Sequence, residues 1–362
     1  MAQGLIMDFR RLLKQIVLGN AKYIEFCFIF LALFLLSYPM LYFSYKYFTP
    51  SIGYSDYFNY YKMYKDPLDL HAAVSPLVFR QISAILTNLT YNAGAHYNTT
   101  IVYSPNKQDM GIFFSALLVN YVALLGSATL VSALIYGALR RNLPLALVGG
   151  VTVLLSFYAT GGVLTGLTEG VSWLIFTLIF LCVSLRRWLV VAIGLILLST
   201  FQRETISIAF LAMAAVGFFT EKKSRLYFAP LMAASLCSFL LYIAMNIWIS
   251  AAPRHGYELS LQFVIHNIEN IRSNSGFLLQ SIASQNVLVL LLGVMIINSK
   301  RRVIDVEYHM VFAAVAALTI LGILAGEGNS TGRIVAILTP ALAVLFARQL
   351  NIISARSEAE LA

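Results

Sequence analysis

Charged side chains are scarce in this chain. Only 11% of its 362 residues are Asp, Glu, Lys or Arg, against about a quarter in an average soluble domain. Hydrophobic residues make up 59%, and the mean hydropathy is +0.79. The apolar runs are continuous rather than alternating, which argues against a transmembrane barrel. The composition therefore excludes an ordinary soluble domain and predicts an all-α, polytopic bundle of transmembrane helices.

Cysteine is also rare. Cys27, Cys182 and Cys237 lie in apolar runs, without the spacing of a disulfide framework or a metal site, so we interpret them as packing residues. The five histidines are scattered along the chain and predict no metal cluster. A divalent cation stays possible as a cofactor, but no residue pattern indicates one.

Basic residues are few but regularly placed. They occupy every second connection between apolar runs, as at Arg140-Arg141, Arg186-Arg187 and Lys300-Arg301-Arg302. This is the positive-inside pattern, and it predicts that both termini are cytoplasmic. The net charge of +9 is spread over these connections, so a nucleic-acid partner is not expected. The expected surroundings are membrane lipids.

Hydropathy predicts about ten spans. They cover 23–44, 111–138, 143–160, 170–185, 188–202, 205–220, 226–250, 276–298, 307–326 and 334–348. Several of these runs are shorter than the roughly 20 residues that a span needs. The connections predicted to face outward are 45–110, 161–169, 203–204, 251–275 and 327–333.

The chain divides into three predicted parts. Residues 1–20 form a basic amphipathic segment on the cytoplasmic surface, which we expect to be retained because no small-residue cleavage site follows. The transmembrane domain covers 21–350, and a cytoplasmic tail covers 351–362. The long outer loops are 45–110 and 251–275. In these loops amphipathic helices are predicted over 56–64, 76–86 and 258–274.

Charges in the outer connections are the candidates for chemistry. Arg203 and Glu204 lie between two apolar runs, and ionisable groups within a membrane are costly and by default functional. The same face is expected to hold Asp56, Arg80, Glu169, Arg254, Glu327 and Arg333. A carboxylate can serve as a general base, and arginines bind phosphate. The pattern predicts one hydrated pocket for an anionic substrate with a hydroxyl to activate.

Each of these residues also has a purely structural interpretation. The 203–204 pair would neutralise itself, or pair with Glu327 and Arg333 to fix helix ends. Glu169 would be a helix N-terminal residue favoured by the helix dipole. Asp56 would be a solvated acid in a loop whose tyrosines form an aromatic interface belt. The sequence leaves these alternatives open.

The order of these features resembles the GT-C class of membrane glycosyltransferases. The segment Tyr54-Ser55-Asp56-Tyr57-Phe58, followed by Pro76-Leu77-Val78-Phe79-Arg80, is similar to the first-loop pattern of the small bacterial members. The 203–204 tip and the segment from Glu327 to Arg333 fit the general layout of the class. The chain lacks the soluble C-terminal domain of larger members. It also lacks the second acid beside Asp56 that metal-dependent relatives have, so no metal is assumed.

The resemblance implies transfer of a sugar from a polyprenyl-phosphate donor to a lipid-linked or cell-envelope glycan, with inversion, at the outer face of a bacterial inner membrane. The roles that follow are Asp56 as catalytic base; Arg80, Arg203, Arg254 and Arg333 on the donor phosphate; and Glu169, Glu204 and Glu327 as supporting acids. Two alternatives stay open: a polysaccharide polymerase of the O-antigen type, and a transporter or lipid-glycan flippase.

Overall fold

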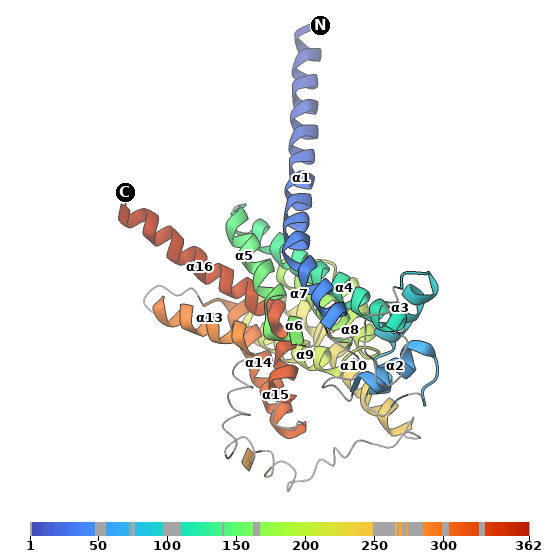
Figure 1. The fold of residues 1–362 in the computed structure, drawn as a ribbon. Coiled ribbons are helices and arrows are strands. Elements are labelled where there is room, and N and C mark those ends of the chain that lie inside the picture. The colour runs from blue at the N-terminus through green and yellow to red at the C-terminus, as the bar shows by residue number, and fades with distance from the viewer. Residues whose placement is uncertain are drawn as a thin grey trace.

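The computed structural model is all-helical, with no strand among the residues it describes (Figure 1). This confirms the predicted class. The structure describes residues 2–47, 56–71, 73, 77–96, 110–139, 141–161, 167–248, 265, 268–269, 273, 285–298, 304–325 and 330–361.

The helices follow the apolar runs of the sequence. The long ones are α1 (Ala2–Tyr47), α4 (Met110–Ala138), α10 (Arg225–Trp248), α14 (Val306–Ala325) and α16 (Thr339–Leu361). Shorter helices are α5 (Leu143–Leu154), α6 (Phe157–Gly161), α7 (Glu169–Leu185), α8 (Leu189–Ser199), α9 (Glu204–Thr220), α13 (Asn286–Ile297) and α15 (Ser330–Val335). The first long loop contributes α2 (Asp56–Lys65) and α3 (Gln81–Asn92).

Within the described part of the chain, five helices are long and apolar enough to cross a membrane. They cover Ile24–Lys46, Met110–Ala138, Lys222–Trp248, Val306–Leu324 and Gly332–Ala355. Five shorter apolar helices, α5, α7, α8, α9 and α13, lie where the other spans were predicted. The transmembrane character is thus supported, whereas the count of about ten spans stays a prediction.

Polar contacts at both ends of α7 and α9 show that these helices run in the same direction. At their starts, Arg203 Nη1 lies 3.4 Å from Glu169 Oε1. Just beyond their ends, Arg186 Nη2 lies 2.8 Å from Glu221 Oε1. Each helix has 17 residues and so rises about 25 Å, near the roughly 30 Å of a hydrocarbon core. Two charged layers therefore bound an apolar layer about as deep as a bilayer interior.

Close helix packing depends on small residues. A Cβ built on Gly217 of α9 would lie 2.5 Å from the Phe228 ring of α10, so a larger residue would require this ring or the helix to shift. Interhelical hydroxyl contacts add to this packing, as between Ser207 Oγ and Ser238 Oγ at 2.6 Å. Small residues and hydroxyls at helix contacts are typical of membrane bundles.

Large apolar side chains cover the outside of the bundle. Leu35 on α1 and Leu240 on α10 are 62% and 53% exposed, and both belong to long apolar helices. An exposed apolar surface of this kind is stable in lipid but not in water. The exposure pattern therefore agrees with an integral membrane protein.

The loop helices depart from the predictions in one place. Helix α2 agrees with the predicted 56–64, but the second loop helix begins at Gln81 rather than at Pro76, because a 3₁₀ turn over Leu77–Phe79 comes first. The helix predicted over 258–274 falls almost entirely outside the described residues.

Both chain ends extend beyond the bundle on the same side of Figure 1. Residues 2–20 form the first part of α1, and residues 351–361 form the last part of α16. The division into a surface segment, a transmembrane domain and a tail stays a prediction.

Candidate functional site

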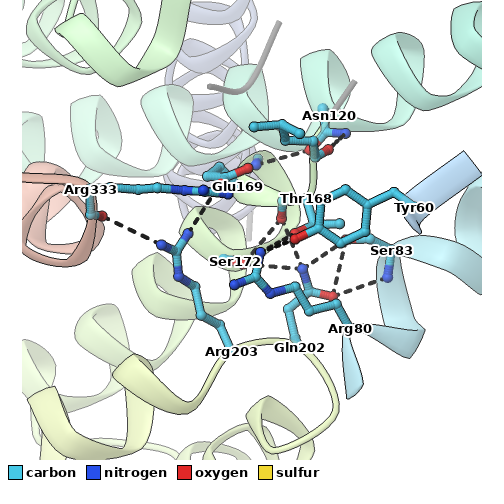
Figure 2. A network of polar contacts seen from close by, with 12 residues as sticks. Tyr60, Arg80, Ser83, Asn120, Thr168, Glu169, Ser172, Gln202, Arg203 and Arg333 are labelled. Carbon is cyan, nitrogen blue, oxygen red and sulfur yellow. Dashed lines mark hydrogen bonds and ion pairs between the residues drawn. The ribbon is translucent and has the colours of Figure 1, made fainter. Parts of the chain in front are cut away.

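Three arginines from separate connections meet at the first turn of α7 (Figure 2). Arg80 directly precedes α3, Arg203 is the N-cap of α9, and Arg333 lies in α15. Arg80 and Arg203 are only 8% and 4% exposed. Arg80, Glu169 and Arg203 each lie at the start of a helix, and the starts of α3, α7 and α9 lie close together.

Glu169 is the acid on which two of these arginines converge. Arg333 Nε donates to Glu169 Oε1 at 2.8 Å, and Arg203 Nη1 lies 3.4 Å from the same oxygen. Arg203 Nη2 also reaches the backbone carbonyl of Arg333 at 3.5 Å. Glu169 is the first residue of α7, where the helix dipole favours a negative charge. Its helix-start position and its ion pairs therefore act together.

Arg80 has a different environment. Its Nη1 donates to the hydroxyl of Tyr60 on α2 and to Thr168 Oγ1, the latter at 3.4 Å. No carboxylate among the described side chains, which do not include that of Asp56, forms an ion pair with Arg80. Its direct contacts are therefore neutral oxygens, and the carboxylates Glu169 and Glu204 act on its charge without touching it.

Among the described side chains, the cluster holds more cations than acids. Three guanidinium groups, Arg80, Arg203 and Arg333, face two carboxylates, Glu169 and Glu204, which gives three minus two, or +1 without the side chain of Asp56, which is not described. The buried Nε atoms of Arg80 and Arg203 have no hydrogen-bond acceptor in the described part of the chain. Buried donors without acceptors are costly, and guanidinium groups pair well with phosphate. The arrangement suits a phosphate-like anion.

The electrostatic balance differs between the two buried arginines. Burial lowers the pKa of Arg80, but Tyr60 and the nearby carboxylates outweigh it, so the pKa lies above its usual value. Burial also lowers the pKa of Arg203, and the neighbouring Arg80 and Arg333 add to this, so the pKa lies below its usual value. Arginine keeps its charge at neutral pH in either case.

Gln202 holds the three charged segments together. Its Oε1 accepts from the backbone N and the Oγ of Ser83, both at 3.0 Å. Its Nε2 donates to Thr168 O at 2.9 Å and to Ser172 Oγ at 3.1 Å. One buried amide thus joins α3, α7 and the turn before α9. Arg203 follows Gln202 directly, so its position is fixed by the same bonds.

Asn120 docks α4 against the start of α7. Its Oδ1 accepts from Gly170 N at 3.0 Å, and its Nδ2 donates to Leu167 O at 2.5 Å. A Cβ at Gly170 would lie 2.5 Å from the Asn120 carbonyl oxygen. The glycine therefore permits the close approach that places Glu169.

Sequence reasoning did not single out Gln202 or Asn120 as site residues. Both are neutral amides, so a search for charges passes over them. A usable signal existed, because a side-chain amide within an apolar run is costly unless it is hydrogen-bonded.

The structure unites five of the predicted site residues: Arg80, Glu169, Arg203, Glu204 and Arg333. Arg203 forms an ion pair with Glu169, and its neighbour Glu204 acts on its charge without an ion pair among the described side chains. Glu204 itself is half-buried.

The structure describes one further predicted site residue only in part and two not at all. Asp56 begins α2, one helical turn before Tyr60, and only its backbone is described. Arg254 and Glu327 lie outside the described residues. The roles assigned to these three remain predictions.

No three acids, histidines or cysteines come together as a metal site in the part of the chain that the structure describes. Comparisons with protein-family models, with curated proteins and with solved structures found no match for this chain. The site must therefore be interpreted from its own geometry.

Proposed function

We propose that the protein is a membrane glycosyltransferase that takes a sugar from a polyprenyl-phosphate donor and transfers it to a lipid-linked or cell-envelope glycan. The observation that carries this proposal is the convergence of Arg80, Arg203 and Arg333 at one end of an apolar bundle. A lipid-linked phosphate matches both properties, since its chain is apolar and its headgroup is anionic.

The arginines would hold the phosphate that leaves. Phosphate oxygens would accept from the free Nε atoms of Arg80 and Arg203, and charge that develops on the departing phosphate would be stabilised by preorganised donors. Arg333 is the most accessible of the three, with a side chain 25% exposed, so the headgroup would enter from its side. Glu169 would keep Arg203 and Arg333 oriented while the Nε atoms of Arg80 and Arg203 bind the ligand.

Asp56 would be the base. It would take the proton of the acceptor hydroxyl while that oxygen bonds to the anomeric carbon. The bond from this carbon to the phosphate oxygen would break, and polyprenyl phosphate would leave with the electron pair. One displacement of this kind inverts the anomeric carbon. The backbone supports this role to the extent that α2 carries both Asp56 and Tyr60, whose hydroxyl contacts Arg80.

The test is an assay in membranes with a panel of polyprenyl-phosphate sugars. We expect Arg203→Ala to lower turnover by about 10²–10³-fold, as for other donors to a developing negative charge. We expect Asp56→Asn to lower it by about 10²–10⁴-fold. Arg225→Ala and Asp69→Asn are matched controls, because Arg225 is exposed beside the opposite charged layer and Asp69 only caps a loop amide.

Full turnover in both site variants would refute the assignment of these residues. Phosphate binding without turnover of any donor would contradict an enzymatic function and favour a transporter or flippase. Loss of glycan chain length rather than of one sugar, in a strain that lacks the protein, would favour a polymerase.

A further inference from the structure

A cavity of about 480 Å³ lies between α3 and the residues that end and follow α2. It is separate from the arginine cluster, and its size falls within the roughly 300–1,000 Å³ of small-molecule sites. Its polar lining consists of Lys65, Asp66, Asn88, Tyr91 and Asn92. Pro67, Leu68 and Ile112 supply an apolar lining.

The wall of this cavity is held by two asparagines of α3. Asn88 Nδ2 donates to the carbonyl oxygens of Tyr64 at 2.8 Å and Lys65 at 3.2 Å, which satisfies acceptors at the end of α2. Asn92 Nδ2 donates in turn to Asn88 Oδ1 at 2.9 Å. These bonds fix the turn after α2 over α3, so the cavity is preformed.

Several polar groups of the lining remain available. The Asp66 carboxylate has no hydrogen-bond or ion-pair partner among the described residues, and the same holds for the carbonyl oxygen of Asn92. The Lys65 amine lies over the Tyr61 ring at 4.7 Å. One cation and one acid give the lining no net charge, so neither an anion nor a cation is favoured.

We infer that this cavity binds a neutral saccharide. Amide, carboxylate and amine groups together supply both donors and acceptors, which is what adjacent sugar hydroxyls require. Leu68, which is 80% exposed, offers an apolar surface for the C–H face of a sugar ring, and the buried Ile112 closes the wall. An anion or a cation would meet one like charge for each opposite charge, at Lys65 and Asp66, and an apolar ligand would leave the polar groups unpaired.

The cavity and the arginine cluster are joined by one rigid element. Arg80 directly precedes α3, and the cavity residues of this helix run from Asn88 to Asn92, so they lie about 12–18 Å from Arg80 along the helix at 1.5 Å per residue. A glycan held in the cavity would extend its growing end along α3 toward the donor phosphate. This role as the acceptor site rests on the proposed function, whereas saccharide binding itself does not.

The test uses the full-length protein in nanodiscs on an array of neutral mono- to tetrasaccharides. We expect wild type to bind some members. We expect Asn92→Ala and Asp66→Ala to weaken that binding about tenfold each, as for the loss of one polar contact. Lys62→Ala is the matched control, because Lys62 is exposed on α2 and does not line the cavity. Melting temperatures of all variants show whether each is folded.

A second arm measures binding of undecaprenyl phosphate by the same variants. Saccharide loss with unchanged phosphate binding supports the cavity as a separate site. Wild type that binds no saccharide, or equal saccharide binding in folded Asn92→Ala and Asp66→Ala, overturns the inference and leaves the proposed function standing. Saccharide binding in a protein that binds no phosphate removes only the acceptor role.

Discussion

Glu169 and Arg333 are 164 positions apart in the chain, yet Arg333 Nε donates to Glu169 Oε1 at 2.8 Å. The carboxylate is 1% exposed, so this contact and the Arg203 contact on the same oxygen are shielded from water. Removal of the acid would leave two guanidinium groups without their shared partner.

We therefore expect Glu169→Gln to lower the free energy of unfolding by about 3–5 kcal/mol, as for other broken buried pairs. Glu221→Gln is the control, because its pair with Arg186 is partly exposed and should contribute about 1 kcal/mol or less. Thermal unfolding in detergent measures both. Equal shifts in the two variants would contradict the view that the Glu169 cluster is the buried, water-excluded one.

Gly170→Ala should displace the start of α7. The added Cβ would lie 2.5 Å from the backbone carbonyl oxygen of Asn120, so α7 and α4 must move apart here, which disturbs the position of Glu169. We expect a lower melting temperature and weaker phosphate binding. Gly194→Ala is the matched control, since a Cβ there meets nothing within 4 Å. At that site the helix should gain up to about 1 kcal/mol. A Gly170→Ala variant as stable as Gly194→Ala would show that this close approach is not required.

Gln202→Leu should be among the most damaging neutral substitutions. It keeps the approximate volume but leaves the Ser83 amide and hydroxyl and the Thr168 carbonyl without this partner. Each unsatisfied buried group costs about 1–3 kcal/mol. Thr220→Val is the comparison, because its hydroxyl bond to Val216 O is exposed. Unchanged melting of Gln202→Leu would mean that other groups join α3 to α7.

Substitutions of Arg186 can separate the effect of backbone conformation on stability from the effect of charge. Its φ of 52° is left-handed, a region that costs a non-glycine residue about 1–2 kcal/mol. Both Arg186→Ala and Arg186→Gly lose the ion pair with Glu221, but only glycine removes the strain. We expect the glycine variant to be more stable than the alanine variant by about 1 kcal/mol in thermal unfolding. At Arg187, which is not among the residues with positive φ, the order should reverse. The same order at both positions would refute the role of backbone strain.

The apolar runs and their basic connections were sufficient to predict an all-helical membrane bundle, because burial of backbone hydrogen bonds in lipid favours helices. The second loop helix was placed too early, at Pro76. There the structure has a 3₁₀ turn over Leu77–Phe79 before α3 begins at Gln81. Helix boundaries in loops depend on local packing, and all three residues of this turn are buried.

Sidedness carried the prediction of the site. Arg80, Glu169 and Arg203 belong to different connections, and the predicted alternation of spans puts them at one end of the bundle. Gln202 and Asn120 could not be assigned in the same way. Their function in the cluster comes from hydrogen bonds across elements, and a sequence gives no distances between elements.

The sequence by itself determined that the protein lies in a membrane and that its candidate site charges gather at one end of the helix bundle. Both properties follow from hydropathy and from the positions of charged residues along the chain. Only the tertiary structure decided which charges meet. Among the described side chains, Arg203 forms an ion pair with Glu169 on α7 and not with its neighbour Glu204, and Arg80 contacts the Tyr60 hydroxyl rather than an acid. Such choices depend on distances of a few ångströms between helices, because Coulomb and hydrogen-bond energies fall steeply with separation.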